Sequence, residues 1–204
     1  MKKAKIGTWI TTYNPSALDV ISKCNFDWVC IDMEHSSITL DQLENLLNVL
    51  DKNKSFSYVR VSENNKTEIK KVLDLGAKGI IVPMVNTALE AKNAINYATY
   101  PPKGQRGFAL ARAQGFGFDL INYKKVSENI KIVVQIETSK AINNLEEILK
   151  VKGLYSTLIG PRDLSGSIGK PGDYGNKNFI KALQKYEKIS RQSKVSMGMH
   201  VAFP

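Results

Sequence analysis

Two carboxylates and a histidine follow one hydrophobic run closely enough to do acid–base chemistry together. Asp32, Glu34 and His35 come directly after the strand-like run at residues 26–31. A carboxylate beside an imidazole orients the ring and raises its basicity, which makes a general base that works near neutral pH. A solvent-exposed loop histidine is an equally good interpretation of this spacing alone. The other histidine, His200, has no comparable neighbours, and we expect it to be structural.

A second group of acidic side chains has the chemistry to hold a metal ion. Residues 131–137 alternate in type, which places Gln135 and Glu137 on one face of a strand and aliphatic residues on the other. Asp163 lies in the Gly-rich stretch 159–169, which we expect to form a turn with inward-pointing N–H groups. Glu137 and Asp163 together would suit a hard divalent cation that keeps several waters. The alternatives are a helix-capping Glu and a hydrogen-bonded turn Asp.

Two further charged residues stand where a purely structural role would be costly. Arg60 ends the run at residues 56–60, and an arginine entering a buried strand end needs an anion. It is either a substrate clamp, which we favour, or an ion-pair partner of Asp32 or Glu34. Asp74 precedes a glycine at a predicted helix end, where a negative charge opposes the helix dipole. We therefore expect something other than helix stability to place Asp74 there.

The elements that must position these residues are parallel βα units. Short runs rich in Val, Ile and aromatic residues alternate with longer stretches that have helical spacing. The predicted strands cover residues 5–10, 26–31, 56–61, 79–82, 131–136, 157–159 and 195–199. The predicted helices cover residues 15–23, 40–53, 66–75, 87–98, 140–151 and 178–193. Residues 100–123 are the exception, a long irregular piece. Within it, Pro101 and Pro102 forbid a helix over residues 100–107, which we expect to form a lid or wall.

This rhythm fits either a doubly wound sheet or a TIM (β/α)8 barrel. No GxGxxG sequence follows a strand, which disfavours the dinucleotide-binding sheet. We therefore predict an α/β fold of the TIM (β/α)8 type over residues 1–204 as a single domain. A complete barrel takes ~250 residues, so the eighth βα unit is absent from this sequence. Chemistry in such a barrel sits at the carboxyl ends of the strands, where the residues above are expected to meet.

Composition excludes several classes of function. The chain has 29 Lys and Arg against 19 Asp and Glu, a formal charge of +10. The excess is Lys scattered along predicted helices, so we expect no nucleic-acid partner, but an attraction for anionic small molecules.

No apolar run approaches the ~18 to 20 residues of a membrane span and no secretory signal is visible, which predicts a cytoplasmic protein without a membrane partner. Cys24 and Cys30 have neither disulfide nor zinc spacing, and we expect both to be buried.

Several motifs together resemble one family, the metal-dependent class II pyruvate aldolases of the HpcH/HpaI type, relatives of the citrate lyase β-subunit. They run in family order across nearly the whole chain. The matching stretches are Asp27-Trp-Val-Cys-Ile-Asp-Met-Glu-His35, Val59-Arg-Val61, Leu73-Asp-Leu-Gly-Ala77, Gly79-Ile-Ile-Val-Pro83, Tyr100-Pro-Pro-Lys-Gly-Gln-Arg-Gly107, Gln135-Ile-Glu-Thr138 and Ile159-Gly-Pro-Arg-Asp-Leu164.

The resemblance implies an enzyme that cleaves or forms a 4-hydroxy-2-oxo acid, giving pyruvate and an aldehyde, with a divalent cofactor such as Mg, Mn or Co. It implies the following roles for single residues: metal ligands Glu137 and Asp163, acid/base His35, enolate stabiliser Arg60, pyruvate-binding positions Gln135 and Arg162 with Asp163, and Asp74 or Asp32 as the acid that raises the basicity of the histidine. It also implies a homo-oligomer that acts on a small 2-oxo acid. The alternatives are a CoA-thioester lyase of the citrate lyase β type and a truncated, non-catalytic remnant.

Overall fold

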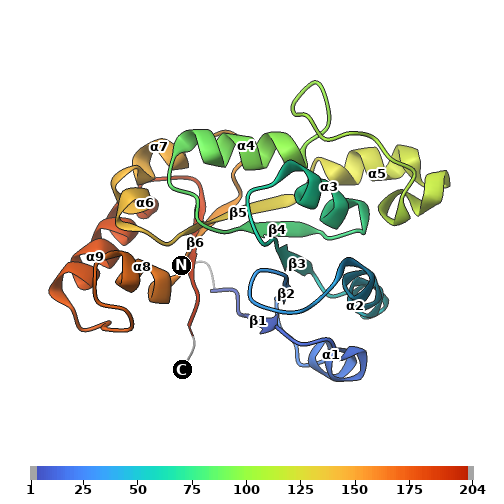
Figure 1. The fold of residues 1–204 in the computed structure, drawn as a ribbon. Coiled ribbons are helices and arrows are strands. Elements are labelled where there is room, and N and C mark those ends of the chain that lie inside the picture. The colour runs from blue at the N-terminus through green and yellow to red at the C-terminus, as the bar shows by residue number, and fades with distance from the viewer. Residues whose placement is uncertain (1–3, 202–204) are drawn as a thin grey trace.

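Seven parallel strands curl into an open barrel in the computed structural model, which describes residues 4–201 (Figure 1). The strands lie side by side in chain order, so each pairs with its sequence neighbours. They are β1 (Gly7–Ile10), β2 (Trp28–Asp32), β3 (Ser57–Arg60), β4 (Gly79–Val82), β5 (Lys131–Ile136), β6 (Ser156–Ile159) and β7 (Ser196–Met199). The predicted barrel-type fold without an eighth unit is confirmed. In the described part of the chain, β1 and β7 each pair with one strand only.

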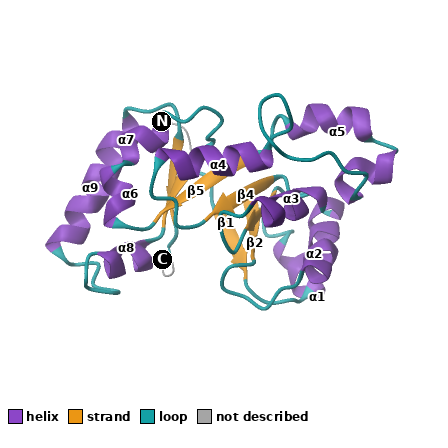
Figure 2. Ribbon diagram, turned by 45° about the horizontal axis from the view of Figure 1, so that its top comes forward, coloured by secondary structure: helices purple, strands orange, loops and turns teal. Residues whose placement is uncertain are grey.

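Helices cover the outer face of the curled sheet (Figure 2). They are α1 (Pro15–Ile21), α2 (Leu40–Lys52), α3 (Lys66–Asp74), α4 (Ala88–Ala98), the 3₁₀ helix η1 (Arg112–Gly117), α5 (Leu120–Ser127), α6 (Ser139–Asn143), α7 (Leu145–Leu149), α8 (Pro161–Ser167) and α9 (Lys177–Arg191). Local sequence sets several of their starts. Thr39 and Gln42 form a capping box at the start of α2, and Asn14 caps α1 just before Pro15. In residues 4–201, no helix combines the length and the apolar character needed to cross a membrane.

Strand alternation divides the apolar side chains between two packed regions. One lies between the sheet and the helices and includes Ile132, Val134 and Ile136 of β5. The other lines the inside of the barrel, where Val133 packs with Cys30 and side chains of the neighbouring strands. The period-two interpretation of β5 is therefore confirmed. Its consequence is that Gln135 and Glu137, next on the inner face, are carried to the carboxyl end of the barrel.

Several local predictions were wrong. The helix predicted at 140–151 is divided at Asn144 into α6 and α7. The Gly-rich stretch forms α8 rather than a turn, because Pro161 stands at its first position and Asp163 in its first turn, where both favour a helix. Cys24 is exposed, whereas Cys30 is buried as expected.

Residues 100–107, expected to form a lid or wall, do not cover the predicted site. Gln105 and Arg106 donate backbone hydrogen bonds to the end of α4, at Asn96 and Thr99. Because α4 runs antiparallel to the strands, this end lies at their amino termini, opposite the predicted chemistry. The later part of the irregular piece predicted at residues 100–123 is helical, as η1 and the beginning of α5.

Candidate active site

Polar side chains gather at the carboxyl ends of β2, β3 and β5. Asp32 and Arg60 end adjacent strands and stand in register with each other. Gln135 is in β5, and Glu137 directly follows that strand. All four residues are buried in the described structure, each with 1% to 7% of its surface exposed. Buried polar groups at this end, above an apolar barrel interior, mark it as the candidate site.

Arg60 is the central cation of this group. Its Nε and Nη2 donate to the two carboxylate oxygens of Asp32 at 2.8 and 2.6 Å, and its Nη1 lies 2.8 Å from Oε2 of Glu34. The guanidinium carbon lies 4.8 Å from the centre of the Trp9 ring. Burial alone would raise the pKa of Asp32, but the hydrogen bonds and charge of Arg60 hold this pKa below its ordinary value. The ion pair considered from the sequence is thus present, and a substrate-clamping role stays a prediction.

Asp32 also shapes the loop that carries His35. Its Oδ1 accepts backbone N–H groups of Glu34 and His35 at 3.0 and 3.3 Å, and its carbonyl accepts the hydroxyl of Ser36. The His35 side chain is 67% exposed, and its Nε2 lies 3.9 Å from Oε2 of Glu34. Asp32 therefore positions the histidine through the backbone. The nearest carboxylate to the imidazole is that of Glu34.

Glu137 is fixed by groups from three segments. Its Oε2 accepts the backbone N–H of Met84 at 2.8 Å, and its Oε1 accepts Nε2 of Gln135 at 2.9 Å. Gly160 passes so close that a Cβ there would lie 2.4 Å from Oε1. The carboxylate is thus held at the inner rim of the barrel with little freedom to move.

The carboxylates at this end of the barrel outnumber the one buried cation, Arg60, that faces them in the described structure. Burial, together with the charges of Glu34 and Asp163, raises the pKa of Glu137 to about 7, while the Met84 N–H and Arg60 act in the opposite direction. Burial likewise raises the pKa of Glu34, although Arg60 opposes this. Arg60 is bound to Asp32 and also lies 2.8 Å from Glu34, which leaves Glu137 without an ion-pair partner among the described residues. A bound cation would relieve this repulsion.

The raised pKa of Glu137 has a measurable effect on metal-free protein. Between about pH 4.5 and 7 the folded state holds a proton that the unfolded state has released, so stability falls as pH rises through this window. In chelator, we expect Glu137→Gln to match the wild type near pH 4.5 and to exceed it by up to ~3 kcal/mol above pH 7. Urea unfolding across this range measures the difference, and a difference independent of pH would contradict the assignment.

The donor set fits a hard divalent ion that keeps water ligands. Glu137 offers carboxylate oxygens, and Asp163 stands exposed in the first turn of α8, close enough for its charge to act on Glu137. Oε1 of Gln135 is buried beside them without a hydrogen-bond partner in the described residues. Within residues 4–201, no three His, Cys, Asp or Glu side chains come close enough to enclose an ion by themselves. Carboxylates completed by water suit magnesium-like ions.

The structure does not bring Asp74 to this group. Asp74 ends α3, next to the amino end of β4, and its Oδ1 accepts Nη2 of the buried Arg106 at 2.7 Å. This ion pair with Arg106 explains why an acidic residue stands at the end of α3, so no interaction with His35 is needed to account for Asp74. Arg162 is exposed on α8 beside Asp163, within the same end of the barrel.

Sequence reasoning missed other residues at the site. The backbone of Met84 and the absence of a side chain at Gly160 both fix Glu137, yet neither has a chemical signature in the sequence. His200 has a neighbour after all, because its ring lies 5.0 Å from that of Trp9. Burial, together with the charge of Arg60, lowers the pKa of His200. Trp9, an aromatic residue on the inner face of β1, is the feature of the sequence from which this contact could have been predicted.

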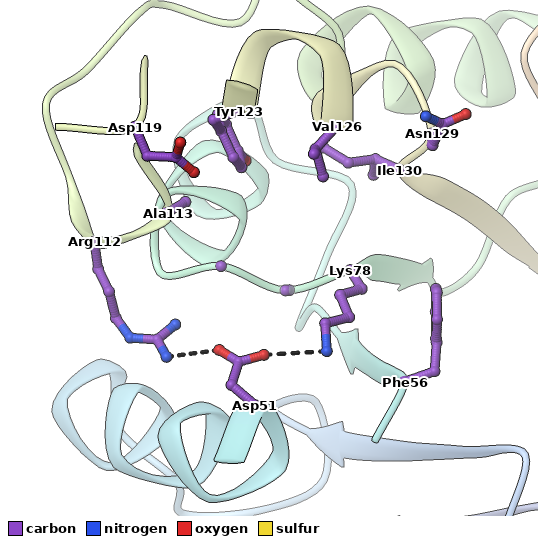
Figure 3. Close-up of a pocket in the computed structure, with 12 residues that line it drawn as sticks. Asp51, Phe56, Lys78, Arg112, Ala113, Asp119, Tyr123, Val126, Asn129 and Ile130 are labelled. Atoms are coloured by element: carbon purple, nitrogen blue, oxygen red, sulfur yellow. Dashed lines mark hydrogen bonds and ion pairs between the residues drawn. The ribbon is translucent and has the colours of Figure 1, made fainter. Parts of the chain in front are cut away.

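A cavity of about 480 Å³ lies elsewhere, at the amino ends of the strands (Figure 3). In it, Asp51 joins Arg112 and Lys78 through ion pairs of 2.7 and 3.2 Å. These cations are already partnered, and the buried carboxylates are at the opposite strand ends. The cavity is therefore not the candidate active site.

Comparison with known proteins agrees with this placement. The family described as HpcH/HpaI aldolase/citrate lyase matches residues 5–203. A "2-keto-3-deoxy-L-rhamnonate aldolase" from Escherichia coli O1:K1 is 36% identical, over 99% of this chain and 76% of the relative. A family protein from Burkholderia cenocepacia J2315 superimposes with a TM-score of 0.91 at 26% identity, over 96% of this chain and 79% of that one. An HpcH/HpaI aldolase from Desulfitobacterium hafniense DCB-2 gives 0.90 at 25%, over 99% and 79%.

The agreement extends over the strands that carry the site and not only over the general architecture. The match covers every strand that contributes a buried polar residue to the carboxyl end of the barrel. The aldolase interpretation of the sequence agrees with the names of these relatives, which are carbon–carbon lyases. Sequence, fold and site thus lead to one assignment: the chain belongs to the HpcH/HpaI aldolase/citrate lyase family.

Proposed function

We propose that this protein is a metal-dependent aldolase that cleaves or forms a 4-hydroxy-2-oxo acid, with pyruvate and an aldehyde as the other side of the reaction. The observation that carries this proposal is the uncompensated acidic rim around Glu137 beside the buried cation of Arg60. The relatives named 2-keto-3-deoxy-L-rhamnonate aldolase support a sugar-derived 2-oxo acid as substrate. We further propose Mg²⁺, Mn²⁺ or Co²⁺ as cofactor, a cytoplasmic location and a homo-oligomer.

Glu137 and Asp163 would hold the divalent ion. When bound, such an ion supplies Lewis-acid stabilisation of the negative charge that develops on a 2-oxo acid as its C–C bond breaks. Gln135 keeps Glu137 in place by donating from Nε2, and its unpartnered Oε1 remains available to a ligand or water at the rim. The substrate is itself an anion, and the carboxylates of Glu137 and Asp163 would repel it. Positive charge from the protein is therefore also required.

Arg60 provides that positive charge. Asp32 holds its guanidinium in one orientation through two hydrogen bonds, so the charge is placed before the substrate arrives. The Nη1 group, now 2.8 Å from Glu34, is the part of Arg60 that a substrate carboxylate or oxyanion would compete for.

His35 moves the proton. In cleavage its imidazole takes the proton of the 4-hydroxyl group, directly or through water, and in synthesis it returns this proton. The ring is exposed at the mouth of the barrel, where it can reach a hydroxyl on an incoming substrate, and Glu34 is its nearest acid.

The test is pyruvate release from a panel of 4-hydroxy-2-oxo acids, with and without a chelator. We expect activity only with divalent metal. In Glu137→Ala we expect a loss of activity on the order of 10³-fold, because this substitution removes a metal ligand and so weakens binding of the metal. Activity that survives both treatments would contradict the proposal. Metal binding without cleavage of any substrate in the panel would instead indicate a non-catalytic member of the family.

A further inference from the structure

A groove of about 340 Å³ lies between α6 and α9, two helices that stand side by side in the layer covering the barrel (Figures 1 and 2). The apolar part of its lining is Ile142, Ile168 and Ala182, which belong to or pack against the core between the sheet and the helices. The buried carboxylates of the candidate active site are instead on the inner face of the barrel. The groove is therefore a separate place in the molecule, and its volume is within the ~300–1,000 Å³ of small-molecule sites.

The groove is positively charged. Lys181 and Lys185 stand one turn apart on the flank of α9 that faces α6, and both line the groove. Among the lining residues in the described part of the chain, none is Asp or Glu. Along α9 the one acid is Glu187, and Arg191 already binds it at 2.6 Å. Neither the lining nor α9 itself therefore neutralises the two lysines.

This placement of lysines is unfavourable for the helix by itself. Two like charges one turn apart repel each other, whereas an acid at that spacing stabilises a lysine. Lys23, for example, pairs with Asp19 at 2.6 Å, one turn away on α1. One turn before and after Lys181 the chain has Lys177 and Lys185. An anion held between Lys181 and Lys185 would remove their mutual repulsion.

Hydrogen bonds fix the walls of the groove. Nζ of Lys185 donates to Oδ1 of Asn143 at 2.9 Å, a bond that joins α9 to α6. Because this amide is neutral, the bond directs the ammonium group across the groove without cancelling its charge. The backbone N–H of Ser139, at the start of α6, donates to Oγ of Ser167 at the end of α8, at 3.0 Å. Walls that are joined in this way need little rearrangement to accept a ligand, which favours binding.

The type of side chain indicates the type of anion. The ammonium group of lysine is a compact charge with three donors and commonly binds phosphate, whereas the planar fork of arginine matches a carboxylate. A phosphate monoester carries about two negative charges at neutral pH, one for each lysine. Asn143, Asn178 and Ser139 add amide and hydroxyl groups to the same lining for the remaining phosphate oxygens.

We propose that the groove between α6 and α9 binds a small phosphate monoester. Its phosphate lies between Lys181 and Lys185, and its organic part lies against Ile142, Ile168 and Ala182. A net charge of +10 draws anions toward the chain in general, and this groove gives that attraction a defined place to act. Binding here is independent of the proposed aldolase activity, which belongs to the inner rim of the barrel.

Isothermal titration of the full chain with phenyl phosphate, in the presence of a chelator, tests the proposal. The chelator removes divalent metal, through which phosphate could otherwise bind at the barrel rim. We expect the wild type to bind saturably, and Lys181→Gln with Lys185→Gln to raise the Kd on the order of 10-fold or more, because two charge-assisted contacts are lost. The matched control, Lys177→Gln with Lys188→Gln, removes the same charge from α9 outside the groove lining and should change the Kd by less than about twofold.

Inorganic phosphate, which lacks the organic part, should bind on the order of 10-fold more weakly than phenyl phosphate. Equal affinity for the two would contradict the role of the apolar lining. No saturable binding by the wild type, or an equal loss in both double variants, would overturn the proposal, since equal losses indicate a general attraction of the chain for anions. So would unchanged binding in the Lys181/Lys185 variant, because the probe would then lie elsewhere. Circular dichroism verifies the fold of both variants, whose four lysines are exposed.

Discussion

Replacing Arg60 with methionine is expected to lower the free energy of unfolding by ~3 to 5 kcal/mol at neutral pH. The side chains of Asp32 and Glu34, 2% and 16% exposed, would then face each other without the guanidinium that binds both. Uncompensated buried carboxylates are costly because neither water nor a counter-charge solvates them. The loss should shrink as the pH falls, since protonation removes the repulsion. Urea unfolding at several pH values measures both effects.

Two comparisons separate this effect from the loss of side-chain packing. Adding Asp32→Asn to Arg60→Met should recover part of the stability, because it removes one of the two carboxylates left without a counter-charge. Arg191→Met breaks an exposed ion pair with Glu187 on α9 and should cost less than ~1 kcal/mol. Equal losses from Arg60→Met and Arg191→Met would show that the buried cluster is not held together by charge.

Gly160→Ala is expected to reduce aldolase activity on the order of 100-fold while leaving the fold intact. The new Cβ would lie 2.4 Å from Oε1 and 2.8 Å from Cγ of Glu137, so this carboxylate must move. The backbone at Gly160 has φ of −97°, which alanine adopts without strain, so the effect comes from the contact alone. A displacement of about 1 Å at a reacting centre is enough for a loss of this size.

Gly166→Ala is the matched control on the same helix. The nearest atom to its Cβ would be Cγ of Pro171, at 3.8 Å, an ordinary van der Waals contact. Alanine also favours a helix more than glycine does, so this variant should keep its activity and unfold at the same or a higher temperature. Steady-state pyruvate release and isothermal titration with Mn²⁺ measure the two variants. Full activity and unchanged metal affinity in Gly160→Ala would mean that Glu137 is not a ligand.

The sequence predicted what depends on local periodicity. The two-residue alternation of β5 placed Gln135 and Glu137 on the inner face, because a strand carries its pattern within itself. The strand-by-strand alternation with helices predicted the order in which Asp32, Arg60 and Glu137 reach one end of the barrel. Periodicity could not separate α8 from a turn, since three glycines within ten residues masked the helix-starting effect of Pro161.

What the sequence could not reveal are contacts made through backbone or between distant segments. Met84 is 53 residues from Glu137 and contributes only an N–H group, which every residue except proline possesses. The partner of Asp74 is Arg106, 32 residues away, so the charge at this helix end had no visible reason in its own neighbourhood. Such pairings become apparent only when the chain path is known.

The strand order of this sheet has a consequence for how the protein is made. Because β1 to β7 lie in the order in which the ribosome releases them, each strand emerges beside a partner that is already available. Among the seven described strands, each one pairs with the strand made just before it rather than with a distant later one, which shortens the time that its backbone groups are open to aggregation during synthesis. Growth by successive addition at one edge also means that a change in β7 leaves the pairings among β1 to β6 undisturbed.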